Sequence, residues 1–297
     1  MVDIGALLLS PRFTANTTGT AADPQTSYGS VRVALVDLTG KTIVITGAGS
    51  GIGAALARRF AEEAPHGVVV ADIDAESAAA VADDIGGVAC ALDVADETAV
   101  IKMIDFARSA YGPVDLLCMN AGIATGGDIT IPNEQWQRTW EVNVMSHVYA
   151  VRAALPDMLA RGHGYLLHTA SAAGLLSNLG AAPYTVTKHA VVALAEWLSI
   201  TYGSAGITVS CLSPQFVRTP MLEMLTEVSP DFSNYAEQVS LSPEELAECV
   251  VEGIATERFH ILPHPEVAGY MENKAADPER WLAGMRKLQR SLGADPR

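Results

Sequence analysis

Short runs of consecutive apolar residues alternate with longer amphipathic segments from Asp37 onward. The apolar runs are Thr42–Thr46, Val68–Asp72, Val88–Leu92, Leu116–Met119, Tyr165–His168, Ile207–Leu212 and Phe259–Leu262. Apolar residues recur at helical spacing in the segments between them, which are Ile52–Glu63, Glu76–Ile85, Ala99–Tyr111, Glu134–Ala160, Tyr184–Tyr202 and Pro243–Glu257. Continuous apolar strands that alternate with helices are typical of a parallel sheet covered on both faces. The pattern therefore predicts a Rossmann-like, doubly wound α/β domain with a parallel sheet of about seven strands over residues 36–263.

The two ends of the chain follow different patterns. Residues 1–35 are rich in Thr, Ala, Ser and Gly without sustained periodicity, which predicts a flexible extension; a start codon placed too early is the alternative. In the tail, 264–297, Asp277 and Pro278 form a good helix start. One apolar stripe follows, made of Trp281, Met285, Leu288 and Leu292. We expect a docked amphipathic helix that packs on its own subunit, covers the active site or contacts a neighbouring subunit.

Composition narrows the class of protein. The chain has 297 residues, 49% hydrophobic and 18% charged, which fits a globular protein with a sizeable core. Its net charge of −15 argues against nucleic acid or an anionic membrane as partner, because phosphate binding requires clustered Lys and Arg. The apolar stretch Ala6–Leu9 is too short to span a membrane and has no basic residue before it, so we expect a cytoplasmic protein without a secretory signal.

Cysteine and histidine give no sign of a metal. The four cysteines, Cys90, Cys118, Cys211 and Cys249, show no C-x-x-C spacing, and the seven histidines form no ligand cluster. We expect core thiols in a reducing compartment and no metal site.

A glycine-rich loop, Thr46–Gly53, follows an expected strand and opens an expected helix. Gly47, Gly51 and Gly53 permit a tight turn and close approach of the backbone to a pyrophosphate, which the helix N-terminus then binds; a glycine-rich turn without a ligand is the alternative. Asp72 ends the next strand, 19 residues after Gly53, where a carboxylate can hold both ribose hydroxyls. It would repel a 2′-phosphate, so this position favours NAD over NADP.

Tyr184 and Lys188 lie four residues apart, which places them on one face of a helix. A nearby ammonium favours the phenolate, so Lys188 is expected to lower the phenol pKa of about 10 and to make Tyr184 an effective acid or base. A half-buried Tyr and a solvated Lys are the alternative. Ser171 lies 13 residues before Tyr184.

Taken in order, these residues resemble the short-chain dehydrogenase/reductase family over roughly 37–262. The family motif T-G-x-x-x-G-x-G is similar to Thr46–Gly53, and the N-A-G element to Asn120–Gly122. The resemblance implies a catalytic set of Asn143, Ser171, Tyr184 and Lys188. It implies cofactor contacts at Gly47, Ser50, Gly51, Ile52, Gly53, Asp72, Asp93, Val94, Asn120, Gly122, Tyr184, Lys188, Val217 and Thr219.

The resemblance also implies reversible hydride transfer between NAD and a secondary alcohol or ketone. Tyr184 would exchange the proton, Lys188 would lower its pKa and hold the ribose, and Asn143 would anchor a relay water. Members of the family commonly form homodimers or homotetramers through helices that here would be Glu134–Ala160 and Tyr184–Tyr202.

Three departures from the family pattern stand out. Met119 precedes N-A-G where the family has Asn, and Gln215 replaces the Gly of a Pro-Gly pair, which puts the local loop shape in doubt. The usual final glycine-rich segment is absent.

The substrate is the least defined part. The segment Pro220–Leu241 is apolar at Met221, Leu222, Met224, Leu225, Val228, Phe232 and Tyr235. It would suit a ring, aryl or alkyl ketone, or it packs on the sheet without touching a substrate. The rival functions are an NAD-binding sensor with a vestigial catalytic set, lyase-type or dehalogenating chemistry, and sugar-nucleotide epimerisation. The intact glycine loop and lysine disfavour the second, and the T-G-x-x-x-G-x-G spacing disfavours the third.

Overall fold

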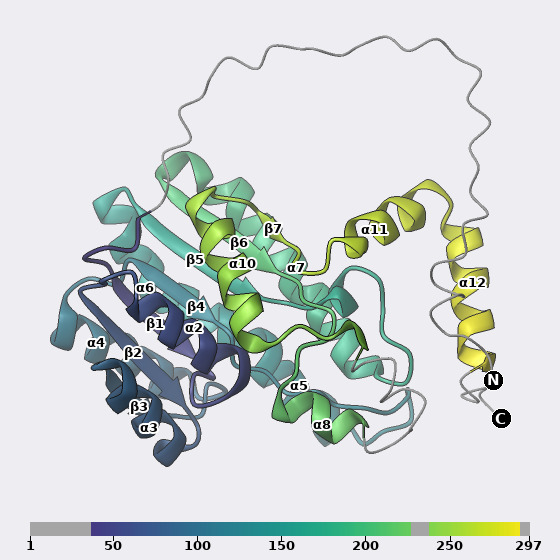
Figure 1. Cartoon of the computed structure of the whole chain (residues 1–297), viewed down its shortest axis with the longest axis horizontal. Helices are drawn as coiled ribbons and strands as arrows, with labels where there is room; N and C mark the ends of the chain where they lie inside the picture. Colours follow the sequence, from purple (N-terminus) through teal and green to yellow (C-terminus); the bar gives the residue numbers. More distant parts are fainter. Residues whose placement is uncertain (1–36, 227–237, 292–297) are drawn as a thin grey trace, which may run out of the picture.

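The computed structural model describes residues 37–226 and 238–291, with side chains given except at 224–226; the predicted extension 1–35 lies outside them. Seven strands form one sheet, and every pairing is parallel. They are β1 (Thr42–Thr46), β2 (Gly67–Asp72), β3 (Val88–Ala91), β4 (Leu116–Met119), β5 (Gly164–Thr169), β6 (Ile207–Leu212) and β7 (His260–Ile261), in the order β3-β2-β1-β4-β5-β6-β7 (Figure 1). The predicted α/β fold is confirmed, with strand bounds within two residues of expectation.

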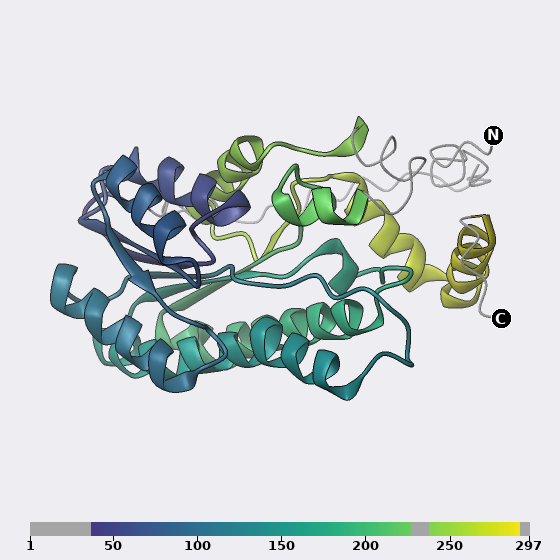
Figure 2. The same ribbon diagram turned by 90° about the horizontal axis from the view of Figure 1, so that it is seen from below.

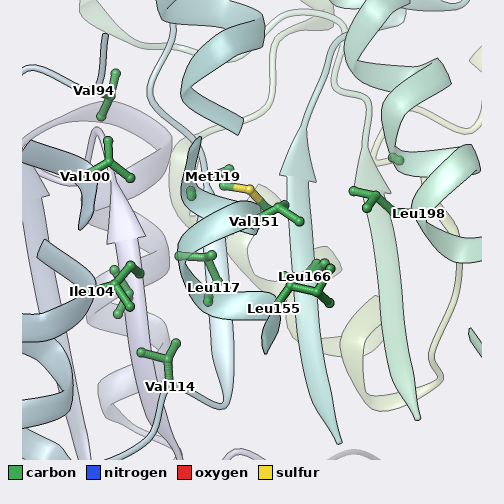
Figure 3. Packing of buried hydrophobic residues seen from close by; sticks show 14 of the residues in the cluster. Val94, Val100, Ile104, Val114, Leu117, Met119, Val151, Leu155, Leu166 and Leu198 are labelled. Carbon is green, nitrogen blue, oxygen red and sulfur yellow. The ribbon is translucent and has the colours of Figure 1, made fainter. Parts of the chain in front are cut away.

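Helices cover both faces of the sheet because alternate strand residues point to opposite sides. One face packs on α2 (Gly51–Ala61), α3 (Ala75–Ile85) and α10 (Pro243–Ala255). The other packs on α4 (Glu97–Tyr111), α6 (Ser146–Arg161) and α7 (Ala182–Tyr202), and Figure 2 shows the two layers in profile. On β4, Leu117 and Met119 point into the second layer, where Figure 3 shows them packed near Val151 and Leu155. Met119, which replaces the family's Asn, is thus a buried apolar core residue.

The strand order reverses direction between β1 and β4. Chain segments leave these two strands toward opposite sides, which opens a crevice at their carboxyl ends. Thr46 closes part of that opening, since its Oγ1 accepts hydrogen bonds from the backbone N–H of Asn120 (3.0 Å) and Ala121 (3.1 Å). The ends of β1 and β4 are therefore fixed relative to each other at the place where the fold class puts its ligand.

The long helix expected over Glu134–Ala160 is interrupted. It consists of α5 (Asn133–Trp140), a π-helical turn at Glu141–Met145, and α6. The N–H of Ser146 donates to the carbonyl of Glu141, five residues back, which is the π-helical bond. A prediction of one continuous helix was wrong here because side-chain periodicity does not reveal a single inserted residue.

The C-terminal tail holds two helices instead of one. The expected helix is α12 (Pro278–Ser291), and the Asp277 carboxylate caps it by accepting from the N–H of Arg280 at 2.9 Å. A helix that the sequence pattern did not predict, α11 (Glu266–Ala276), precedes it. Along the described part of the chain, no helix is both long and apolar enough to cross a membrane.

Candidate active site

A cavity of about 470 Å³ lies over the carboxyl ends of the strands. Most residues that the sequence assigned to cofactor or catalysis line it: Gly47, Ser50, Gly51, Ile52, Asp72, Asp93, Val94, Asn120, Gly122, Ser171, Tyr184, Lys188, Val217 and Thr219. Gly53 and Asn143 are not among the residues that line it. One continuous space thus joins the expected nucleotide loop to the expected proton-transfer groups.

The glycine loop has no room for a side chain at Gly47 or Gly53. A Cβ on Gly53 would lie 2.1 Å from the carbonyl oxygen of Gly47. Gly47 itself has φ +63°, and a Cβ there would lie 2.7 Å from Cα of Ala121. The Nδ2 of Asn120 donates to the carbonyl of Gly47 at 3.2 Å and holds the loop against β4. This cradle fits the pyrophosphate of a dinucleotide, because backbone N–H groups at the start of α2 stay open to an anion.

Asp72 occupies the end of β2 as expected. Its Oδ2 accepts from the N–H of Gly49 at 2.8 Å, and its Oδ1 accepts from the N–H of Asp74 at 3.0 Å. Both oxygens are thereby oriented while each keeps a further lone pair for a ligand. The carboxylate fits a ribose hydroxyl pair.

Asp93 has a partner that sequence reasoning missed. Arg138 of α5 forms an ion pair with it, with Nη1 2.9 Å from Oδ2, and both side chains line the cavity. Burial raises the pKa of Asp93, but hydrogen bonds from Ala95 and Arg138 together with the charge of Arg138 lower it overall. A long-range pairing of this kind leaves no local signal in the sequence.

Tyr184, Lys188 and Ser171 come together as predicted. The Nζ of Lys188 lies 5.7 Å from the centre of the Tyr184 ring and donates to the carbonyl of Thr169 at 2.9 Å. Ser171 is buried, and its Oγ accepts from the N–H of Ala173 at 3.1 Å. The hydroxyl of Ser171 is thus fixed by β5 and the short helix that follows, while α7 supplies the other two groups.

The pKa of Tyr184 is not shifted in the direction that we expected from the sequence. Burial raises the pKa of Tyr184, and the hydrogen bond with Ser171 acts in the opposite direction. Burial also lowers the pKa of Lys188 to about 8. The expected lowering of the phenol pKa is therefore not produced by the chain alone, because desolvation of Tyr184 outweighs its polar neighbours.

Asn143 lies in the π-helical turn and is fully buried. Its Oδ1 accepts from the N–H of Ile123 at 2.8 Å, and its Nδ2 donates to the carbonyl of Ile123 at 3.0 Å and to Oγ1 of Thr187 at 3.1 Å. A Cβ added to Gly122 would lie 3.4 Å from both Asn143 Oδ1 and Lys188 Nζ, so these two atoms face the same small space. Asn143 is thus held rigidly beside the lysine.

A buried histidine pair lies near the carboxyl end of β5. The Nδ1 atoms of His147 (α6) and His168 (β5) are 2.9 Å apart, and both side chains are inaccessible to solvent. Burial lowers the pKa of His147 and lowers that of His168 to about 3, so both rings stay neutral.

The sequence showed no metal cluster, and the described residues contain no group of three or more His, Cys, Asp or Glu that could hold a metal ion.

Gln215 replaces the usual glycine, and the tail holds it in place. Its backbone N–H donates to Nδ1 of His264 at 3.2 Å, and His264 is buried. The carbonyl of the preceding Pro214 accepts from Oγ of Ser171 at 3.4 Å. His264 was not assigned a role from the sequence, because nothing local marks it as a partner of residue 215.

The substrate end of the cavity is mainly apolar. Apolar lining comes from Ile123, Ala172, Ala173, Leu176, Phe216, Met221 and Leu222. Of the loop residues singled out in the sequence, Met221 and Leu222 line the cavity; the side chains of Met224 and Leu225, and all of Val228, Phe232 and Tyr235, lie outside the described part. The first helix of this segment is α8 (Pro220–Thr226).

The tail supports this apolar wall from behind. Leu176 packs in a cluster with Val267, Tyr270, Met271 and Trp281 of α11 and α12. The Nζ of Lys274 donates to the carbonyl of Leu175 at 2.6 Å. The sequence left three positions open for the tail helix. The structure shows it packed on its own subunit, directly behind the apolar wall at the substrate end.

Comparison with known proteins identifies the family. A family model described as short chain dehydrogenase matches residues 41–229. The 1-deoxy-11-beta-hydroxypentalenate dehydrogenase of Streptomyces exfoliatus is 34% identical over 235 residues, 76% of this chain and 84% of the relative. A mitochondrial borneol dehydrogenase of Lavandula x intermedia is 34% identical over 232 residues, 76% of this chain and 88% of the relative.

Among solved structures, a short chain dehydrogenase/reductase from Burkholderia phymatum in complex with NAD matches with a TM-score of 0.73 and 32% identity. The match covers 82% of this chain and 96% of that one. The chain belongs to the short chain dehydrogenase family. It is an oxidoreductase that acts on CH–OH groups, with hydride transfer between a nicotinamide and the carbon of an alcohol or ketone.

Proposed function

We propose that the enzyme uses NAD in preference to NADP and oxidises an uncharged secondary alcohol built on a ring, aryl or alkyl skeleton, or reduces the matching ketone. The observation that carries this proposal is the single cavity that joins Asp72 and the glycine loop to Ser171, Tyr184 and Lys188. Its substrate end has apolar walls, which favour an apolar substrate. The names of two relatives, a hydroxypentalenate and a borneol dehydrogenase, agree with this class.

The proton-transfer step belongs to Tyr184. During oxidation its phenolate accepts the substrate hydroxyl proton, and during reduction the phenol returns it. Ser171 donates a hydrogen bond to the same oxygen and stabilises the charge that develops there. A bound nicotinamide supplies the hydride acceptor, and the positive charge of its oxidised ring favours the phenolate that burial disfavours in the chain alone.

Lys188 and Asn143 support that step. With a pKa of about 8, the buried lysine is largely protonated near neutral pH, and one of its three N–H groups is already fixed by Thr169. The remaining two can bind a ribose hydroxyl and a water. Asn143 Oδ1 faces the same space as Lys188 Nζ, so it can hold that water, which would relay protons between Lys188 and solvent.

The preference for NAD rests on Asp72 and on what surrounds it. The carboxylate would repel a 2′-phosphate, and neither Ser50 nor Ile73 offers a cation to bind one. Arg138 also lines the cavity, but its guanidinium is paired with Asp93. These features support NAD at the adenosine end.

The test is a panel of secondary alcohols offered with NAD and with NADP and followed by absorbance of the reduced cofactor. We expect turnover with NAD, strongest for apolar ring alcohols. The Tyr184→Phe variant should lower kcat by about 10²–10⁴-fold, because it removes the proton acceptor, while NADH still binds in a fluorescence titration. A Tyr184→Phe variant that keeps near-normal turnover would contradict the catalytic assignment. NADH binding without turnover of any alcohol would instead favour a nucleotide sensor.

We also propose a cytoplasmic homodimer or homotetramer. The outer side of α7 exposes large apolar side chains, with Trp197 55% and Ile200 84% accessible. Such residues on one helix face favour association with a second copy. Light scattering coupled to gel filtration measures the assembly, and a monomer at micromolar concentration would exclude it.

A further inference from the structure

Two polar side chains at the substrate end have no partner within the described structure. Ser177 and Asn178 line the cavity and are exposed to solvent. The hydroxyl of Ser177 and the carboxamide of Asn178 make no hydrogen bond to any described residue. Most of their neighbours on this wall, such as Ala173, Leu176 and Ala181, are apolar. Because both side chains are exposed and lie on a mostly apolar wall, packing does not explain their position.

The backbone that carries Asn178 is held firmly. Its N–H donates to Oγ1 of Thr185 at 3.0 Å, and its carbonyl accepts from the same hydroxyl at 3.1 Å. Two residues on, the carbonyl of Gly180 accepts from the N–H of Gly127 at 2.8 Å. Thr185 directly follows the catalytic tyrosine on α7, so the position of Asn178 is fixed relative to the proton-transfer group.

Ser177 adds strain to this arrangement. Its φ is +98°, a conformation that residues other than glycine rarely adopt. Its N–H bonds to the carbonyl of Ala173 at 3.2 Å, which closes the short helix that Ser171 begins. Such strain persists where the surrounding structure over-determines the backbone, and it concentrates at ligand-binding sites. The loop is therefore built to present its side chains in one place.

The charges around the cavity limit what these side chains can bind. From Thr169 onward, the described cavity-lining residues include one charged group, Lys188, which serves the proton-transfer step. A substrate carboxylate or phosphate would find no second cation there. A carboxamide both donates and accepts, so it suits an uncharged hydroxyl or carbonyl.

Gln215 is the other amide that lines this side of the cavity, but its Oε1 is inaccessible to solvent. Asn178 is the exposed one. We propose that Asn178 is a specificity-determining residue that hydrogen-bonds a second, uncharged oxygen function of the substrate. The substrate class is then an apolar ring or chain with two oxygen groups, one oxidised at Tyr184 and one held by Asn178. This inference rests on the proposed alcohol dehydrogenase function.

The experiment compares cyclohexanol with the 1,2-, 1,3- and 1,4-cyclohexanediols as substrates. For the wild-type enzyme, kcat/KM should be about tenfold or more higher for at least one diol than for cyclohexanol, because a site built to bind a hydroxyl discriminates against its absence. Asn178→Leu keeps the side-chain size and removes both polar atoms. It should lower that diol-to-cyclohexanol ratio by about 10–100-fold.

Three further variants separate recognition from structure. Thr185→Val keeps the carboxamide but removes its clamp, and should lower the ratio by less than Asn178→Leu does. Asn273→Leu makes the same change at an exposed position of α11 outside the cavity and should leave the ratio unchanged. Asn178→Ala provides a second test of the position should the leucine variant unfold, as judged by circular dichroism.

Several results would overturn the inference. Wild-type enzyme without preference for any diol is one, and an unchanged ratio in both Asn178 variants is another. An NADH dissociation constant raised more than about threefold in Asn178→Leu, with the diol ratio intact, would assign the residue to the cofactor instead. No turnover of any alcohol with NAD or NADP would overturn the proposed function and this inference with it, whereas turnover with an unchanged ratio overturns the inference alone.

Discussion

The two ends of the cavity are built in different ways. At the nucleotide end, the backbone forms most of the site: Gly47 and Gly53 have no space for a Cβ, a helix begins there, and two N–H groups orient Asp72. At the substrate end, side chains from distant segments form the wall. His264 and Lys274 of the tail hydrogen-bond the backbone of Gln215 and Leu175 there. Backbone geometry tolerates little change, whereas a wall of side chains can be exchanged. The first end is therefore suited to an invariant cofactor and the second to a substrate that varies among relatives.

A matched pair of glycine substitutions tests this contrast most strongly. In Gly53→Ala the new Cβ would overlap the Gly47 carbonyl, so we expect NADH affinity to fall by on the order of 100-fold or more and stability by about 1–3 kcal/mol. Gly180→Ala has open space and only a positive φ of +72°, so its cost should be about 1 kcal/mol. Fluorescence titration with NADH and urea unfolding measure both. Equal loss of NADH affinity in the two variants would remove the distinction between the two ends.

Asp72 sharpens the nucleotide side of the comparison. Asp72→Asn keeps one oxygen acceptor but removes the negative charge that we propose repels a 2′-phosphate. We expect the ratio of NADPH to NADH dissociation constants to fall by about 10–100-fold, since a hydrogen bond to a charged group contributes about 1.5–3 kcal/mol. Competitive titration with both cofactors provides the measurement. A ratio that stays constant would show that selectivity comes from another part of the pocket.

The histidine pair does not line the cavity, and we expect it to affect stability alone. Burial keeps His147 and His168 neutral in the fold, while in the unfolded chain each binds a proton below pH about 6.5. The unfolded state then binds more protons, so stability is full above this pH and declines from there toward pH 3. The double variant His147→Leu with His168→Met should shrink the stability difference between pH 7.5 and pH 5.5 by about 2–3 kcal/mol. Urea unfolding at both pH values measures this. If the pair does not titrate on unfolding, the stability difference between the two pH values would be the same for the wild-type protein and the double variant.

Sequence was sufficient for the parts that depend on local rules. The seven strands and their parallel order follow from continuous apolar runs, and the glycine loop follows from its position between β1 and α2. Tyr184 and Lys188 were singled out because their helical spacing follows a glycine loop and Ser171 in the chain, and in the structure Nζ lies 5.7 Å from the ring centre. These predictions held because each depends on neighbours within one or two elements.

The remainder depends on pairs far apart in the chain. Arg138 meets Asp93 across 45 positions, and His264 meets Gln215 across 49. The raised pKa of Tyr184 could not be foreseen either, because it depends on how deeply α7 buries the phenol. No single-sequence pattern reports burial depth or long-range pairing of polar groups.

The π-helical turn at Glu141–Met145 has a consequence for any redesign of this enzyme. A turn of this kind holds one residue more than α-helical geometry needs. The five residues of this turn cover about the same rotation as four α-helical residues, so removing one would leave α5 and α6 facing much as before. The amide of Asn143, however, would no longer be held by the widened turn beside Ile123 and Thr187. A more regular helix would thus keep the packing of the core and lose the amide that we propose holds the relay water.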